Sequence, residues 1–143
     1  MQNYGQNSKM EDLSLNGKAV WTNGCFDILH VGHIELFKYA KSLGKSLVVG
    51  IDTDARVRRL KGWSRPVNRL EDRATMLKSI SYVDRVVTFD SDEELRGLIK
   101  TFSPSHMVIG SDHKEKEVIG SEYADNLVFF DRIEGYASSN YIN

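Results

Sequence analysis

The segment Trp21–His33, WTNGCFDILHVGH, contains the sharpest change of local structure in the chain. It begins within an apolar run, KAVWT, which predicts a strand over residues 18–22. A turn follows, and the H-V-G-H sequence comes where helical spacing predicts a helix over residues 30–43. Because the unpaired N–H groups at a helix N-terminus attract anions, this strand–turn–helix unit is expected to hold phosphate.

The two histidines of this segment have a spacing that suits one shared ligand. His30 and His33 are three residues apart, so the expected helix places them on one face. Both imidazoles can donate to phosphoryl oxygens and stabilise the charge that develops in phosphoryl or nucleotidyl transfer. Gly32 lets an anion approach the backbone between them. Zinc binding is an alternative that needs a third ligand, such as His106, His113 or a carboxylate.

Strands and helices alternate through the rest of the chain. Apolar runs predict strands over residues 46–51, 85–89, 106–109 and 127–130, and helical spacing predicts a short helix ending at Arg59 and helices over 69–80 and 92–101. Gly and Pro predict a loop over 61–68. This order is typical of a single Rossmann-like α/β domain, with a parallel five-stranded sheet and helices on both faces. Ligands of such sheets bind beyond the carboxyl ends of the strands.

The composition is that of an ordinary globular domain. The chain has 143 residues, of which 41% are hydrophobic and 27% charged. Residues 1–12 are expected to form a flexible tail and residues 13–143 the domain. A net charge of −1 gives no overall basic field for nucleic acid, and no apolar run is long enough for a membrane span. With no signal peptide pattern and one cysteine, Cys25, a cytoplasmic location is expected.

Residues 24–33, GCFDILHVGH, resemble the G-x-F-D-x-x-H-x-G-H signature of the cytidylyltransferase-like nucleotidyltransferases. The resemblance runs from about Gly17 to the C-terminus. It implies a Rossmann-like fold and transfer of an NMP group from an NTP to a small phosphorylated acceptor, with release of pyrophosphate. It assigns His30 and His33 to the triphosphate and the transition state, and Lys61 to a mobile loop that reaches phosphate. It also implies Mg²⁺ held mainly by the nucleotide phosphates, and a possible homodimer.

The resemblance further implies a set of nucleotide-binding residues. They are Asn23, Gly24, Cys25, Phe26, Asp27 and Gly32 in the first motif, and Gly110, Asp112, Arg132, Gly135, Tyr136, Ala137, Ser138 and Ser139 later in the chain. Asp27 is expected to hold the turn or orient a metal-bound water, with helix capping as the alternative. Ala137 stands where relatives have a serine. The loss of that hydroxyl leaves a catalytically weak nucleotide-binding domain as an alternative function.

Two segments favour different substrates. Residues 59–68, RLKGWSRPVN, resemble a loop of the heptose-1-phosphate adenylyltransferases, which transfer AMP from ATP to a sugar 1-phosphate. Residues 132–139, RIEGYASS, are more similar to the R-T-x-G-I-S-T-T motif of the glycerol-3-phosphate cytidylyltransferases. The longer loop favours ATP and a phosphorylated sugar. CTP with a polyol phosphate is the alternative.

Basic residues are concentrated between Arg56 and Arg73. Lys61, Arg65 and Arg73 are expected to bind substrate phosphates, although Arg73 could instead pair with Glu71 or another nearby carboxylate. A nucleic-acid patch is a further interpretation of this run. Class I tRNA synthetases share an H-x-G-H sequence, so an RNA-binding fragment is a third hypothesis. The balanced charge elsewhere and the few aromatic residues in the run favour substrate phosphates over nucleic acid.

Overall fold

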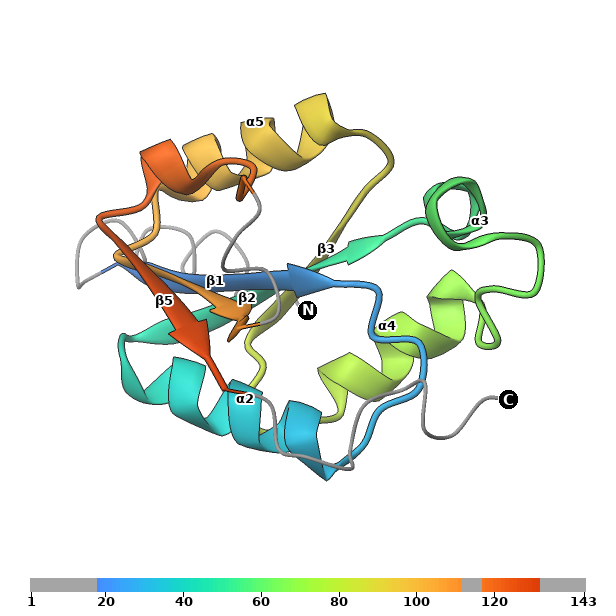
Figure 1. Cartoon of the computed structure of the whole chain (residues 1–143). Helices are drawn as coiled ribbons and strands as arrows, with labels where there is room; N and C mark the ends of the chain where they lie inside the picture. Colours follow the sequence, from blue (N-terminus) through green and yellow to red (C-terminus); the bar gives the residue numbers. More distant parts are fainter. Residues whose placement is uncertain (1–17, 112–116, 132–143) are drawn as a thin grey trace, which may run out of the picture.

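The computed structural model describes residues 18–111 and 117–131. Its centre is a five-stranded sheet in the order β3-β2-β1-β4-β5, in which all neighbouring strands are parallel (Figure 1). The strands are β1 (Ala19–Gly24), β2 (Ser46–Asp52), β3 (Arg85–Phe89), β4 (His106–Gly110) and β5 (Asn126–Phe130). All five predicted strands and the predicted parallel sheet are therefore confirmed.

Helices cover both faces of the sheet, as the sequence predicted (Figure 1). Helices α2 (Val31–Ser42) and α4 (Leu70–Lys78) lie on one face, and α5 (Asp92–Phe102) lies on the other with the short 3₁₀ helix η2 (Ser121–Tyr123). Helix α3 (Asp54–Lys61) lies beyond the carboxyl end of β2. No helix in the described ranges is long and apolar enough to cross a membrane.

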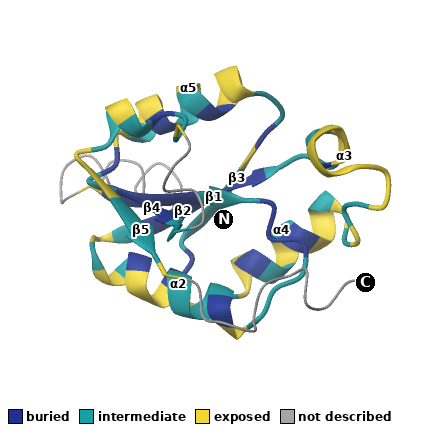
Figure 2. Ribbon diagram, in the orientation of Figure 1, coloured by how far each residue is buried: buried dark blue, intermediate teal, exposed yellow. Residues whose placement is uncertain are grey.

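Alternate side chains of the central strand supply two separate cores. Val20 packs with the apolar residues on the α2 and α4 side, whereas Trp21 packs with those on the α5 side. The buried residues accordingly follow the middle of the sheet (Figure 2). Gly50 in β2 makes room for the Trp21 indole, because a Cβ there would lie 2.6 Å from Cζ2 of the ring.

Several element ends differ from the sequence predictions by one or two residues, and two of these differences bear on the site. Strand β1 continues through Asn23 and Gly24, so the turn into α2 begins at Cys25. Helix α3 continues past Arg59 to Lys61 and ends at Gly62, whose φ of 100° lies outside the helical region. Lys61 therefore lies on the last turn of a helix and not within the loop where the sequence placed it.

Strands β1 and β4, which are neighbours in the sheet, separate toward their carboxyl ends. Strand β1 pairs with β2 over six residue pairs, but with β4 only through Val20–His106 and Trp21–Met107. The order of the strands also reverses between β1 and β4. Ligands of open parallel sheets bind at such a switch point, and the separation of the strands provides space for one.

Candidate active site

His30 and His33 together cap the N-terminus of α2. His30 has an extended backbone, and its Nδ1 accepts a hydrogen bond from the Gly32 N–H at 3.1 Å. The Nδ1 of His33 accepts one from the His30 N–H at 3.2 Å, which closes a capping box. A ring nitrogen that accepts from an N–H carries no proton, so in the neutral rings the proton is on Nε2. The cap thus makes Nε2 the donor of both rings, whose centroids are 3.9 Å apart.

Phe26 connects this cap to the core. Its backbone has a φ of 49°, which is uncommon for a residue other than glycine. The ring makes edge contacts with His33 and Phe37, with centroid separations of 5.5 and 5.2 Å. A Cβ at Gly24 would lie 3.2 Å from the same ring. In the described structure, Phe26 and Gly24 thus support the histidines through packing.

Cys25 is the residue at which the turn begins. Its side chain is buried, and burial raises the pKa of the thiol above its ordinary value. The thiol is therefore neutral at physiological pH, and the residue can contact a ligand without carrying charge.

Asp27 anchors the loop that follows α3. Its carboxylate is 2% exposed and accepts hydrogen bonds from the backbone N–H groups of Val67 and Asn68, both at 2.8 Å. Arg65 makes an ion pair with the same carboxylate at 3.5 Å. Asp27 thus joins the turn before α2 to a second segment 40 residues away. Neither of these two carboxylate bonds goes to the N-terminus of α2, which His30 caps instead.

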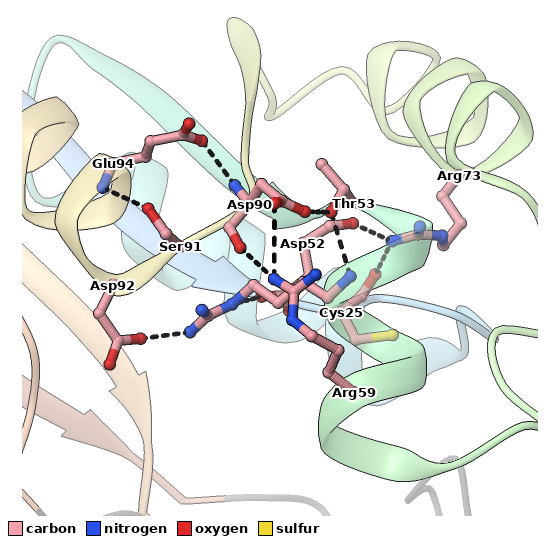
Figure 3. Close-up of polar contacts among 10 residues, drawn as sticks. Cys25, Asp52, Thr53, Arg59, Arg73, Asp90, Ser91, Asp92 and Glu94 are labelled. Atoms are coloured by element: carbon pink, nitrogen blue, oxygen red, sulfur yellow. Dashed lines mark hydrogen bonds and ion pairs between the residues drawn. The ribbon is translucent and has the colours of Figure 1, made fainter.

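Arg73 was predicted to bind substrate phosphate, but the structure places it in the interior. Its side chain has no exposed surface. The guanidinium donates to the carbonyls of Cys25 and Asp52 at 3.0 and 2.8 Å (Figure 3). It also donates to the Asn68 carbonyl at 3.0 Å and to the Asp54 carboxylate at 2.6 Å. In this conformation no surface of the guanidinium is open to a ligand. The alternative of carboxylate pairing is confirmed, with Asp54 as the partner.

Two arginines of α3 bind acidic residues at the end of β2, in the β3–α5 loop and at the start of α5. The Arg56 guanidinium donates to Asp52 at 2.8 Å and to Asp92 at 2.7 Å, and it lies 5.3 Å from the Phe89 ring centroid. The Arg59 guanidinium donates to the Asp90 carbonyl and pairs with its carboxylate (Figure 3). Much of the basic charge of α3 is therefore neutralised within the protein, which argues against a nucleic-acid patch.

The Asp90 carboxylate, which pairs with Arg59, also accepts a hydrogen bond from a side chain. The Thr53 hydroxyl donates to its carboxylate. This bond, together with the charges of Arg59 and Arg56, lowers the pKa of the Asp90 carboxyl. The carboxylate stays ionised under mildly acidic conditions, and the β3–α5 loop keeps its hold on α3.

A cavity of about 300 Å³ lies at the carboxyl ends of the central strands, and the separated ends of β1 and β4 both contribute to its lining. Its polar wall contains Asn23, Asp52, Arg56 and Lys61, and its apolar wall contains Phe89, Leu95, Met107, Ile109, Val118 and Ile119. Gly24, Cys25, Leu60 and Glu117 complete the lining. A cavity of this size with a few convergent polar groups is typical of a small-molecule site.

The cavity brings together some of the predicted site residues. Asn23, Gly24, Cys25 and Lys61 line it, whereas His30 and His33 follow the same turn without lining it. Gly32 is buried in the first turn of α2, and Gly110 ends β4. Asp112, Arg132, Gly135, Tyr136, Ala137, Ser138 and Ser139 lie outside the described residues.

A protein-held metal site is not formed by the described residues. No three His, Cys, Asp or Glu side chains in residues 18–111 and 117–131 are grouped to hold an ion. The Asp27 carboxylate is occupied by two backbone amides, and the Asp52 carboxylate by Arg56. His106, a possible zinc ligand, lies at the amino end of β4, opposite to the end where the cavity lies. The donor groups described here thus do not fit a metal cage.

Sequence reasoning missed the buried contacts of Asp27 and Arg73 and the cavity wall from β2, β3 and α5. These residues meet only through long-range pairing, such as the 48 residues between Arg73 and Cys25. A signal was present for Asp52 and Asp54, because Asp52 ends the mostly apolar strand β2 and Asp54 comes two residues later, at the carboxyl edge of the sheet.

Comparisons with known proteins agree with this geometry. The family model described as cytidylyltransferase-like matches residues 21–128. The chain is 47% identical over 133 residues to the bifunctional protein HldE of Helicobacter hepaticus, and 48% identical over 129 residues to that of Campylobacter fetus. The matches cover 93% and 90% of this chain but 27% and 28% of those proteins. The chain thus spans little more than a quarter of the length of these relatives.

Solved structures show the same fold. A lipopolysaccharide core biosynthesis protein from Thermoplasma volcanium aligns with a TM-score of 0.63 and 27% identity, over 84% of this chain and 98% of that one. The pantothenate synthetase of Thermus thermophilus aligns with a TM-score of 0.61 over 88% of this chain and 60% of that one, at 11% identity, which supports the fold alone. Because the family model matches most of the chain, the protein belongs to the cytidylyltransferase-like family.

Proposed function

We propose that this chain transfers AMP from ATP to a sugar 1-phosphate, with heptose 1-phosphate as the preferred acceptor, and releases pyrophosphate. The observation that carries the proposal is the pair of histidines that cap α2 directly after the turn whose Cys25 lines the cavity, with Nε2 of each ring as the donor. The sugar acceptor is supported by the resemblance of residues 59–68 to the heptose-1-phosphate adenylyltransferases and by the relatives named HldE.

The transfer needs positioning and charge neutralisation more than covalent chemistry from the protein. An oxygen of the acceptor phosphate attacks the α-phosphorus of ATP, and the bond from that phosphorus to the α–β bridging oxygen breaks. Pyrophosphate leaves with the electron pair. His30 and His33 donate from Nε2 to phosphate oxygens, and Lys61 neutralises negative charge from the end of α3.

We propose that Mg²⁺ arrives as part of the ATP substrate. The described carboxylates are engaged with amides and arginines, and Mg²⁺ commonly keeps few protein ligands when it is bound to phosphates. The protein's own contribution is then the arrangement of cationic and N–H donors around the nucleotide.

A pyrophosphate-release assay tests the proposal. ATP and CTP would each be combined with heptose 1-phosphate, glucose 1-phosphate and glycerol 3-phosphate in the presence of Mg²⁺. ATP with heptose 1-phosphate is expected to give the highest kcat/KM. Fastest turnover with CTP and glycerol 3-phosphate would replace the proposal with the cytidylyltransferase alternative.

The histidine controls should preserve the helix cap. Asn is a good N-cap residue and Gln serves at the third position of a capping box, so His30→Asn and His33→Gln remove the imidazole while retaining an acceptor. Each is expected to lower kcat by about 100-fold or more, the usual loss for one transition-state donor. Lys61→Ala is compared with Lys45→Ala, which alters an exposed lysine away from the cavity. A variant that carries both His30→Asn and His33→Gln gives the background rate. If the wild type turns over no faster than this double variant with every substrate pair, the enzyme function is refuted.

A further inference from the structure

Arg73 joins four segments of the chain that surround the candidate site. Its guanidinium donates to Cys25 in the turn before the histidines, to Asp52 at the end of β2, to Asp54 at the start of α3, and to Asn68 in the following loop. We propose that Arg73 is a positioning residue, which fixes Lys61 relative to His30 and His33 and thereby sets the kcat of the transfer. The inference rests on the proposed function.

The contacts explain how one buried side chain can align groups that it does not touch. The Cys25 carbonyl lies in the turn that leads to His30, whereas Asp54 begins the helix that ends at Lys61. Helix α3 has eight residues and is therefore about 12 Å long. A small change of angle at Asp54 becomes a larger displacement at Lys61. A misplacement of about 1 Å in a site of this kind costs roughly 100-fold in rate.

The other contacts of α3 lead away from the histidines. Arg56 ties the helix to Asp92 at the start of α5, and Arg59 ties it to Asp90 in the β3–α5 loop. Asp27 ties the turn to Val67 and Asn68, which follow α3. The hydrogen bonds of Arg73 to Asp54 and Cys25 join the start of α3 directly to the turn.

Arginine suits this position in a way that lysine cannot. The guanidinium is planar and carries five N–H donors, four of which have the partners described above. A lysine ammonium has three donors at one point and would leave at least one of these buried acceptors without its bond. Arg73→Lys therefore keeps the charge that pairs with Asp54 but loosens the junction of the four segments.

The test compares three variants. Arg73→Lys removes part of the set of guanidinium N–H donors. Asp54→Asn weakens the contact between residue 54 and the guanidinium while leaving Arg73 in place. Arg69→Lys is the matched control, because Arg69 is 72% exposed and its ion pair with Glu71 is long, at 3.9 Å. Steady-state kinetics would be measured for ATP and heptose 1-phosphate, together with thermal unfolding and circular dichroism.

Arg73→Lys is expected to lower kcat by about 100-fold while both KM values change less than threefold, since the residue touches neither substrate. Asp54→Asn should show the same kcat-only pattern with a smaller loss, and Arg69→Lys should match the wild type. A raised KM with unchanged kcat would identify Arg73 as a substrate contact, and an unchanged kcat in both variants would refute its role in positioning. If Arg73→Lys does not fold, Asp54→Asn decides between these outcomes.

Hydrogen exchange separates a failure of this inference from a failure of the proposed function. In Arg73→Lys, amides of the Cys25 turn and of the start of α3 are expected to exchange faster together, whereas Arg69→Lys should leave both unchanged. This result does not require turnover. If the wild type is inactive with every substrate pair, the proposed function fails, and unchanged exchange at both segments would independently refute the link through Arg73.

Discussion

Replacement of Asp27 by Asn should release the loop that follows α3 and destabilise the fold. The carboxylate is 2% exposed, and each of its oxygens accepts a backbone N–H at 2.8 Å, from Val67 and Asn68. An Asn side chain has one oxygen and one NH₂ group. It can satisfy one of these amides, but it then points its own N–H groups at the other.

The expected loss follows from these contacts. A hydrogen bond to a charged group contributes about 1.5–3 kcal/mol, and a buried donor left without a partner costs about 1–3 kcal/mol. The remaining bond becomes a neutral one, which is weaker. Arg65 also loses the partner of its ion pair. The terms overlap, so we expect the free energy of unfolding to fall by about 3 kcal/mol.

Urea denaturation of Asp27→Asn and the wild type measures this difference, and hydrogen exchange at Val67 and Asn68 localises it. Asp125→Asn is the control, because Asp125 forms an exposed ion pair with Lys18 and should lose less than about 1 kcal/mol. Equal stability of the two variants, or slow exchange at Val67 and Asn68 in Asp27→Asn, would show that the carboxylate does not anchor the loop.

Three further outcomes are expected. Gly50→Ala forces a methyl group against Trp21 and should lower the free energy of unfolding by about 1–3 kcal/mol. Gly97→Ala places its methyl group in open space on α5 and should raise the free energy of unfolding by about 0.5–1 kcal/mol. Equal effects of the two substitutions in urea denaturation would contradict the packing of Gly50 against Trp21. The Cys25 thiol, with its raised pKa, should react with iodoacetamide at pH 8 more slowly in the folded protein than in urea, and equal rates would mean that it is not buried. Because the folded-state pKa of Asp90 is lowered, its stabilising contribution is present at neutral pH and is lost as the pH falls through that lowered pKa. Thr53→Val removes the first cause of the shift and should move the Asp90 midpoint upward in an NMR titration.

The sequence was sufficient for the arrangement of strands and helices because hydrophobic periodicity is a local property. Continuous apolar runs such as residues 46–51 predicted buried parallel strands, and the strand order agrees with the predicted Rossmann-like fold. Errors were confined to ends of elements. The first strand continues through Asn-Gly because its partner β2 supplies hydrogen bonds up to Ile51, which local turn propensity does not report.

The candidate site could be predicted only in part. The histidine motif and Lys61 were identified from residue types and spacing, and their catalytic roles remain predictions. The buried role of Arg73 could not be predicted, since three of its acceptors are main-chain carbonyls, which every residue has. Whether an arginine points into such a cluster or toward solvent depends on how distant segments of the chain pack together. That packing cannot be inferred from a single sequence.

The early separation of β1 from β4 implies a conflict between the stability of the fold and its capacity to bind a ligand. A chain in which these strands stayed paired to their ends would gain backbone hydrogen bonds and draw together two of the strand ends that line the cavity. Selection for heat resistance alone would therefore favour substitutions that draw the strands together, at the expense of ligand capacity. A thermostable variant obtained without any demand for turnover should be checked for its cavity first, because the most direct gain in stability lies at the place where the ligand enters.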